Sequence, residues 1–129
     1  RECAKAMAKR GVSCAVITQR GRPVGIITER DLVSKVMAEA IEADKALVRD
    51  IMSTPLITIS PDALLQDAAA LMAEYRVRRL VVVDNAGALV GIVTTGDIAR
   101  TMAEKQGYRE ATLNAMARYK EGVEGGPYQ

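Results

Sequence analysis

The sequence predicts an α+β fold built from two copies of one unit, each reading helix, strand, strand, helix. The motif GIITERD at residues 25–31 returns as GIVTTGD at residues 91–97. Aliphatic residues around the two motifs coincide when the chain is aligned with itself at the offset of 66 that separates Gly25 from Gly91. In composition, 49% of the residues are hydrophobic and only 3% are aromatic, so the core is expected to be aliphatic. Together these observations indicate an internal duplication.

A helix is expected to open each copy. Residues 3–11 form the first of them. The second is expected to start at residue 61, because Ser60 can act as the N-cap and Pro61 suits the first helical position. It continues through residues 64–75, where apolar side chains recur at spacings of three and four and so form one stripe.

Two strands and a closing helix follow in each copy. The first strand of each pair is a short continuous aliphatic run, which is typical of a strand covered on both faces. Turns that contain Gly, Asn or Asp join it to its partner. The expected strands are residues 15–18, 23–28, 80–84 and 89–94. The closing helices carry apolar stripes that start at Leu32 and Ile98.

The second copy has an additional predicted strand in front of it, at residues 56–59. The counterpart of this strand in the first copy would lie before Arg1, so the first copy is expected to lack its leading strand. The predicted organisation is a first repeat at residues 1–46, a second repeat at residues 47–105, and a C-terminal helical extension with a flexible tail at residues 106–129. Residues 41–50 are interpreted as a charged connector between the repeats.

Composition excludes several classes of function. A net charge of +2 is too small to indicate nucleic-acid binding, and four Tyr with no other aromatic residue offer few stacking platforms for bases. The chain has no His, which excludes catalysis or metal binding through His. Cys3 and Cys14 are expected to be buried reduced thiols. No long apolar run or signal peptide is present, so we expect a cytoplasmic protein without catalytic or metal-binding residues.

The repeated motif has two compatible interpretations. Thr28 with Asp31, and Thr94 with Asp97, each have the spacing of a capping box at a helix start. The same geometry suits a ligand, because a strand that runs into a helix offers free amides to an anion and a Gly admits a ligand close to the backbone. A Thr hydroxyl can donate to a phosphate or sugar oxygen, and an Asp can accept from both hydroxyls of a ribose diol.

These residues resemble a known family. The two motifs, together with the segment IMSTPLITISPDALLQDAAALMAEYRVRRLVVVD, look like a tandem cystathionine β-synthase (CBS) domain pair, the Bateman module, over residues 1 to about 105. The resemblance implies two β-α-β-β-α repeats related by pseudo-twofold symmetry. It also implies an adenosine ligand in the cleft between repeats, such as AMP, ADP, ATP, S-adenosylmethionine or NAD. By this resemblance the motif Asp holds the ribose, and the motif Thr holds the phosphate or sugar.

The candidate nucleotide-binding residues follow from the motifs and the resemblance. Ile26, Ile92, Ala15, Val81, Ile57 and Thr58 are candidates for contacting the base, although most of them could simply be core residues. The full set of site residues is Gly25, Ile26, Thr28, Asp31, Thr58, Arg79, Gly91, Ile92, Thr94 and Asp97.

Three arginines are expected to make the two sites unequal. Arg76, Arg78 and Arg79 precede the first strand of the second copy, where they form either a solvated basic patch or a phosphate site. At the offset of 66 their counterparts are Arg10, Val12 and Ser13, so only Arg76 has a basic partner. The hypothesis is that the site of Thr94 and Asp97 prefers phosphorylated adenosine, and that the other site tolerates less charge.

Three functions remain open on the sequence. The first is a regulatory, energy-sensing module that binds an adenine nucleotide and signals to a protein partner. The second is a ligand-free dimerisation or interaction scaffold. The third, a regulatory insert of an enzyme such as IMP dehydrogenase, is disfavoured because a short chain with its own tail favours a stand-alone CBS protein. The resemblance also implies a homodimer formed through helix faces.

Overall fold

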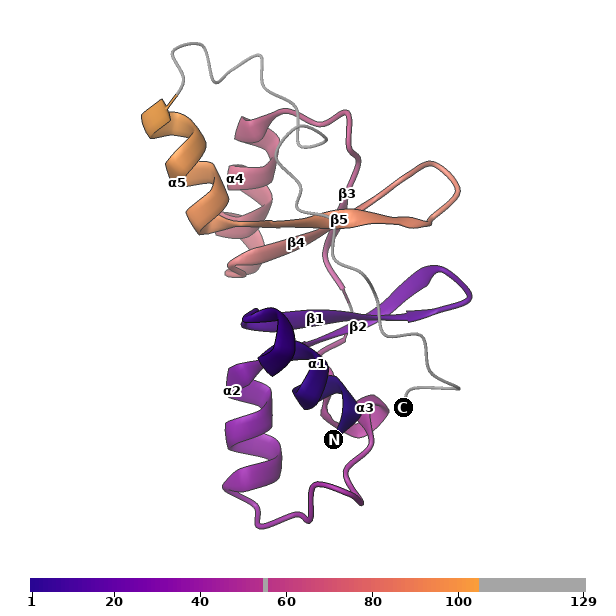
Figure 1. Cartoon of the computed structure of the whole chain (residues 1–129). Coiled ribbons are helices and arrows are strands. Elements are labelled where there is room, and N and C mark those ends of the chain that lie inside the picture. Colours follow the sequence, from indigo (N-terminus) through magenta and orange to yellow (C-terminus); the bar gives the residue numbers. More distant parts are fainter. Residues whose placement is uncertain (55, 105–129) are drawn as a thin grey trace. The chain divides into compact units, whose positions relative to one another are not determined.

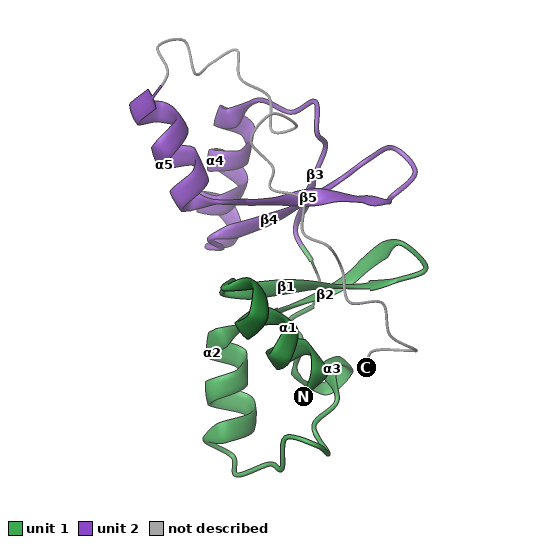
Figure 2. Cartoon of the chain, in the orientation of Figure 1, with its two compact units in different colours: residues 1–56, 121–129 green, residues 57–120 purple. Residues whose placement is uncertain are grey.

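The structure is a computed structural model that describes residues 1–54 and 56–104. The predicted C-terminal helix and tail lie outside these residues. The chain divides into two compact units, with the division between Leu56 and Ile57 (Figure 2). Each unit contains one copy of the repeated motif, so the duplication seen in the sequence corresponds to a division in packing.

The first unit places its helices on one face of a two-stranded antiparallel sheet (Figure 1). Gly11 ends the first helix in the left-handed conformation, with φ of 61°, which a residue without Cβ adopts freely. A short π-helical segment, η1, continues the helix that follows the motif. The elements are α1 (Glu2–Arg10), β1 (Cys14–Gln19), β2 (Arg22–Thr28), α2 (Glu29–Leu32), η1 (Val33–Met37) and α3 (Val48–Ile51). The sheet has two strands within the described residues, as expected for a repeat without its leading strand.

The second unit has a three-stranded sheet in the order β3-β4-β5 with α4 and α5 on one face (Figure 1). The strand β3 runs parallel to β4, and β5 runs antiparallel to β4. Its elements are β3 (Thr58–Ile59), α4 (Leu65–Tyr75), β4 (Arg79–Val83), β5 (Leu89–Thr94) and α5 (Thr95–Glu104).

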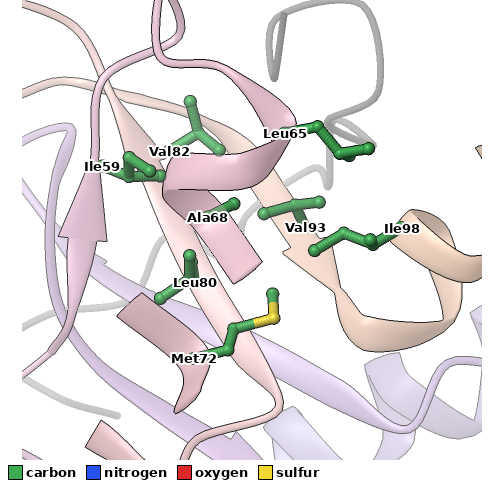
Figure 3. Packing of buried hydrophobic residues seen from close by; sticks show 8 residues of the cluster. All are labelled: Ile59, Leu65, Ala68, Met72, Leu80, Val82, Val93 and Ile98. Carbon is green, nitrogen blue, oxygen red and sulfur yellow. The ribbon is translucent and has the colours of Figure 1, made fainter. Parts of the chain in front are cut away.

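Each unit has its own aliphatic core between helices and sheet. In the second unit the buried cluster joins both helices to all three strands (Figure 3), and it consists of Ile59, Leu65, Ala68, Met72, Leu80, Val82, Val93 and Ile98. The first unit buries Cys3, Met7, Ile17, Ile27 and Val48 in the same manner. Cys3 and Cys14 are both free and buried, as the sequence analysis predicted. Burial raises the pKa of the Cys3 thiol.

One predicted boundary differs from the structure, and one short helix was missed. The helix expected from residue 61 begins at Leu65 instead. Ser60 forms a turn in which its Oγ accepts from the Asp62 amide at 3.2 Å, while Asp67 accepts from the Leu64 amide at 3.0 Å and supplies the capping interaction four residues later. The short helix α3 was not predicted, because four residues are too few to show a helical period.

The alignment offset of 66 is wrong for the first half of each repeat. Thr28 pairs with Cys14 in the first hairpin, and Thr94 pairs with Arg79 in the second. The second strands are therefore 66 residues apart, but the first strands are 65 apart, because the second hairpin contains one more residue. The left-handed helix end shows the same shift, since Gly11 corresponds to Arg76, with φ of 61° and 54°. Arg79 thus corresponds to Cys14 rather than Ser13, and Arg76 has no basic counterpart.

The boundary between the packing units lies further along the chain than the predicted repeat boundary after residue 46. Val48 belongs to the core of the first unit. Ser53 forms an antiparallel bridge with Ile26 of β2. Residues 47–54 therefore pack with the first unit, although in sequence they lead into the second repeat.

Candidate functional site

The first motif forms a complete capping box at the junction of β2 and α2. The Asp31 amide donates to Thr28 Oγ1 at 3.2 Å. In return, Asp31 Oδ2 accepts from the Thr28 amide at 2.9 Å and from Thr28 Oγ1 at 3.1 Å. The capping interpretation of the sequence is therefore correct for this motif.

The other carboxylate oxygen of Asp31 binds groups from outside the motif. Lys35 Nζ lies 3.0 Å from Asp31 Oδ1, and Ser53 Oγ donates to the same oxygen at 3.5 Å. Burial by itself raises the pKa of Asp31, but the hydrogen bonds from Thr28 and the contact with Lys35 outweigh it. The pKa of Asp31 therefore lies below its ordinary value, and the group is a carboxylate at neutral pH.

The second motif repeats this geometry at the junction of β5 and α5. Asp97 Oδ2 accepts from the Thr94 amide at 2.9 Å and from Thr94 Oγ1 at 3.0 Å, while the Asp97 amide donates to Thr94 Oγ1 at 3.2 Å. Arg100 forms a hydrogen-bonded ion pair with Asp97 Oδ1. Asp97 is more deeply buried than Asp31, with exposed fractions of 2% and 8%.

These bonds limit what each motif can offer a ligand. A hydroxyl has a single proton, and both Thr side chains already donate theirs to the Asp. In this arrangement the Thr oxygen can only accept, so it suits a sugar hydroxyl better than a phosphate. One oxygen of each Asp is occupied by the capping box, and Oδ1 of each contacts a cation from the same helix.

Arg79 is the candidate residue with an unmet hydrogen bond. It lies directly opposite Thr94 in the β4–β5 ladder. Opposite residues of an antiparallel pair project to the same face of the sheet, so Arg79 and Thr94 share a face. Within the described residues its Nε atom is buried and has no hydrogen-bond partner. A buried donor without an acceptor costs free energy, and an added anion at this position would remove that cost.

The register also sorts the candidate base contacts. Val81 pairs with both Thr58 and Ile92, so these three side chains lie on the sheet face that carries Arg79 and Thr94. Ile26 lies opposite Val16 in the first unit and is not a member of its core cluster. By contrast, Ala15 and Ile57 pack against the helix-facing cores. These last two were candidates on the sequence, and the structure assigns them to the core instead.

The two motif glycines face the core rather than the sheet face that carries the candidate site residues. Gly25 lies opposite Ile17, and Gly91 opposite Val82, both of which are core residues. A Cβ on Gly25 would lie 2.3 Å from the Met52 Sδ, so the side chain of Met52 occupies the space that the missing side chain leaves. On that side of β2 the protein itself therefore fills the space beside Gly25.

Lys35 and Arg100 are the functional candidates that the sequence analysis missed. Each contacts Oδ1 of a motif Asp from its own helix, Lys35 four residues after Asp31 and Arg100 three residues after Asp97. Oppositely charged residues at these spacings are neighbours on a helix surface. The signal was therefore present in the sequence, as a basic residue within one turn of each motif Asp.

Comparison with known proteins identifies the family. A model of the CBS domain matches residues 1–38 and 48–104. The chain belongs to the CBS domain family. The match covers both motifs and both hairpins, so the resemblance inferred from the sequence is confirmed.

CBS relatives differ in how much of their length this chain covers. The uncharacterized protein MK0525 of Methanopyrus kandleri is 44% identical over 98 residues, which are 75% of this chain and 50% of that protein. The CBS domain-containing protein YhcV of Bacillus subtilis is 33% identical over 113 residues, covering 88% of this chain and 79% of that protein. The chain thus spans half the length of the first relative and most of the second.

Solved CBS structures confirm the predicted α+β fold. The CBS domain protein PAE2072 from Pyrobaculum aerophilum, in complex with AMP, has a TM-score of 0.68 at 31% identity, covering 84% of this chain and 79% of that chain. The CBS domain pair of protein MJ0100, in complex with 5′-methylthioadenosine and S-adenosyl-L-methionine, has a TM-score of 0.68 at 32% identity, covering 81% and 82%.

The described residues show neither a metal-binding cluster nor a membrane-spanning helix. They contain no group of three or more Cys, Asp or Glu side chains arranged to hold a metal ion. Nor does any helix among them have both the length and the apolar character needed to cross a bilayer.

Proposed function

We propose that this chain is a regulatory module that binds an adenosine nucleotide at its motif junctions and signals occupancy to a protein partner. The observation that carries the proposal is the placement of Arg79. A cation with a buried, unsatisfied Nε lies on the same sheet face as Thr94, at the motif that also supplies a carboxylate. The two CBS structures with adenosine ligands support the class of ligand.

The ligand would divide its contacts between the sugar and the phosphate. A ribose hydroxyl donates to Oδ1 of Asp97, and a second one donates to Thr94 Oγ1, whose own proton is committed to the carboxylate. The phosphate falls to Arg79, since guanidinium and phosphate form paired charge-assisted bonds. Ile92 and Thr58 flank the base, and Gly91 contributes backbone only.

The first motif would bind a less charged adenosine compound. Thr28 and Asp31 repeat the sugar contacts, and Ile26 replaces Ile92. The residue opposite Thr28 is Cys14, where the second motif has Arg79. Without that cation, a phosphate at the first motif would lack its strongest partner, which favours a nucleoside or thioether ligand there. Gly25 enters this proposal through its backbone alone.

Calorimetric titration with AMP and with adenosine tests the second site. In Arg79→Ala we expect the AMP affinity to fall about tenfold or more, because a hydrogen bond to a charged group contributes roughly 1.5–3 kcal/mol. Adenosine, which lacks the phosphate, should bind parent and variant alike. Arg78→Ala is the matched control, since Arg78 is an exposed arginine next to Arg79. Equal AMP affinity in the parent and Arg79→Ala would remove the phosphate role.

Substituting each motif Asp separates the two sites. Asp31→Ala and Asp97→Ala should each remove one equivalent of ligand in titrations with AMP, ADP, ATP, NAD and S-adenosylmethionine. Both variants also lose a helix cap, so the thermal midpoint of each must first show that the folded state is populated at the titration temperature. If both variants retain full stoichiometry, the motifs serve only as caps, and a ligand-free interaction scaffold becomes the better hypothesis.

The same proposal covers the setting of the protein. We place the protein in the cytoplasm as a non-enzymatic homodimer, on the basis of its composition and of properties common in the CBS family.

A further inference from the structure

All four acceptor positions of the Asp31 carboxylate are already used. Oδ2 accepts from the Thr28 amide and hydroxyl, and Oδ1 accepts from Lys35 Nζ at 3.0 Å and Ser53 Oγ at 3.5 Å. A carboxylate offers about two lone-pair positions on each oxygen. A ligand hydroxyl that binds Asp31 must therefore displace one of these four donors. The pair on Oδ2 belongs to the capping box itself, so the donors on Oδ1 are the ones that yield.

Both donors on Oδ1 are tied to the segment that follows the first repeat. Lys35 Nζ also donates to the Ile51 carbonyl at 2.8 Å, at the end of α3. Ser53 belongs to the same segment, where its amide donates to the Ile26 carbonyl at 2.8 Å. Lys35 thus joins the motif carboxylate to α3, and through it to residues 48–53, which in sequence lead from one repeat to the next.

The ion pair between Lys35 and Asp31 is weak enough for a ligand to replace it. The side chain of Lys35 is 43% exposed, and ion pairs with an exposed partner contribute little to stability. Lys35 also lies within η1, where the Ala38 amide donates to the Val33 carbonyl five residues back at 2.8 Å. Short π-helical turns are rare and occur frequently at functional sites.

We propose that Lys35 is a positioning residue that couples occupancy of the first motif to the docking of residues 48–53. A sugar hydroxyl on Asp31 Oδ1 competes with Lys35 and Ser53 for that oxygen, so binding weakens the attachment of this segment. The inference rests on the proposed nucleotide binding and adds to it the route by which occupancy leaves the site. At the second motif the cation on Asp97 is Arg100, three residues away on α5, so a ligand there meets a cation of the same helix.

Hydrogen–deuterium exchange of the Ser53 and Ile26 amides reports the docking directly. The Ser53 amide donates to the Ile26 carbonyl at 2.8 Å, and the Ile26 amide donates to the Ser53 carbonyl at 3.3 Å. Saturating adenosine, which lacks the phosphate, should speed their exchange about fivefold or more, the lower end of typical couplings between sites. Lys35→Met should speed it without adenosine, and adenosine should then add little. Since coupling is reciprocal, Lys35→Met should also raise the adenosine affinity of the first motif.

Controls separate this role from a general loss of charge or stability. Lys35→Arg keeps the charge and should restore slow exchange. Lys45→Met removes a connector lysine that pairs with Glu42 at the surface, and it should leave exchange at residues 48–53 unchanged. Ser53→Ala removes the second donor on Oδ1 and should act in the same direction as Lys35→Met, which keeps the test available if that variant folds poorly.

Three outcomes overturn the proposal in different ways. If adenosine binds to the parent and Asp31→Ala removes one equivalent of it, but exchange at Ser53 and Ile26 is unchanged, the coupling is absent while the proposed function stands. If Lys35→Met exchanges as the parent does, Lys35 does not hold the segment. If AMP and the other adenosine compounds do not bind at all, the proposed function fails, and this coupling fails with it.

Discussion

At the residue scale, one carboxylate at each motif caps the start of a helix with one oxygen and contacts a cation with the other. The capping contacts at Asp31 and Asp97 agree to within 0.1 Å between the two motifs, from 2.9 to 3.2 Å in each. Such agreement across a duplication shows that this local geometry follows from the Thr-x-x-Asp spacing itself. What differs between the copies is the cation on Oδ1 and the residue opposite the Thr.

The lowered pKa of Asp31 gives a prediction about stability. Because the folded-state pKa lies below the unfolded value of about 3.9, the charged form contributes stability above that pH and loses it as the pH falls through the folded-state pKa. Asp31→Asn should reduce the free energy of unfolding by about 1–3 kcal/mol at pH 7. Urea unfolding at a series of pH values should show the difference from the parent shrinking in acid.

An exposed acid provides the control for this experiment. Asp62→Asn changes an exposed acid in the turn that precedes α4. Its effect on the free energy of unfolding should be small. A difference between the parent and Asp31→Asn that stays constant from neutral pH into acid would contradict the linkage argument.

The motif residues of the candidate site were predictable from the sequence, but their hydrogen-bond partners were not. The Thr and Asp of each motif could be found because they recur at one spacing, and their role as caps followed from that spacing. That each Thr hydroxyl gives its single proton to the motif Asp shows only in the folded motif. Ser53 reaches Asp31 Oδ1 from 22 residues along the chain, which no local spacing indicates. The unsatisfied Nε of Arg79 likewise depends on three-dimensional packing.

At the element scale, Gly25 of the first motif and Gly96 of the second should respond oppositely when each is replaced by alanine. A Cβ on Gly25 in β2 would lie 2.3 Å from Met52 Sδ and 3.0 Å from its Cβ. We expect Gly25→Ala to destabilise the protein by about 1–3 kcal/mol, as overpacking does. A Cβ on Gly96 in α5 meets only Thr94 Oγ1 at 3.6 Å, an ordinary contact. Gly96→Ala should therefore stabilise by about 0.5–1 kcal/mol.

Denaturant unfolding measures both changes, and a double variant tests the mechanism. Met52→Ala removes the side chain that Gly25→Ala would strike, so the two substitutions together should cost less than the sum of each alone. Additive effects would show that Met52 does not account for the need for Gly at this position.

Most elements were predictable because their signals are local and repeated. The four long strands and the opening helices follow from aliphatic runs and from spacings of three and four residues. Two features failed for identifiable reasons. Ser60 and Pro61 are residue types that favour the start of a helix, but Ser60 stabilises a turn and the helix starts at Leu65. The offset of 66 hid a one-residue difference between hairpins, which only strand pairing reveals.

At the scale of the whole molecule, that one-residue difference changes which residues correspond. With Arg79 matched to Ser13, the two sites would differ by a polar residue; with Arg79 matched to Cys14, they differ by a buried thiol opposite the motif Thr. A duplication that keeps both motif carboxylates but has a cation opposite only one motif Thr supports the proposal of two ligands of unequal charge. This asymmetry is the basis for the different ligand classes proposed for the two motifs.

The helices after the two motifs should support self-association. Leu32 and Ile98 begin the predicted apolar stripes, but both pack toward their own cores, so they are not the contact surface that the sequence suggested. The exposed members are Val33, Met37 and Met102, with exposed fractions of 55%, 75% and 49%. Val33 and Met37 both lie on η1, and large apolar side chains left in solvent mark interaction surfaces when they cluster.

We expect sedimentation equilibrium of the parent to give twice the chain mass of 13.9 kDa. Met37→Glu should shift the population toward the monomer, because it places a charge where apolar contact is expected and a buried unpaired charge is costly. Gln19→Glu adds the same charge at an exposed position in the first hairpin and should leave the mass unchanged. A parent that sediments as a monomer over the accessible concentrations would remove the dimer, and the signal from residues 48–53 would then have to reach a different protein.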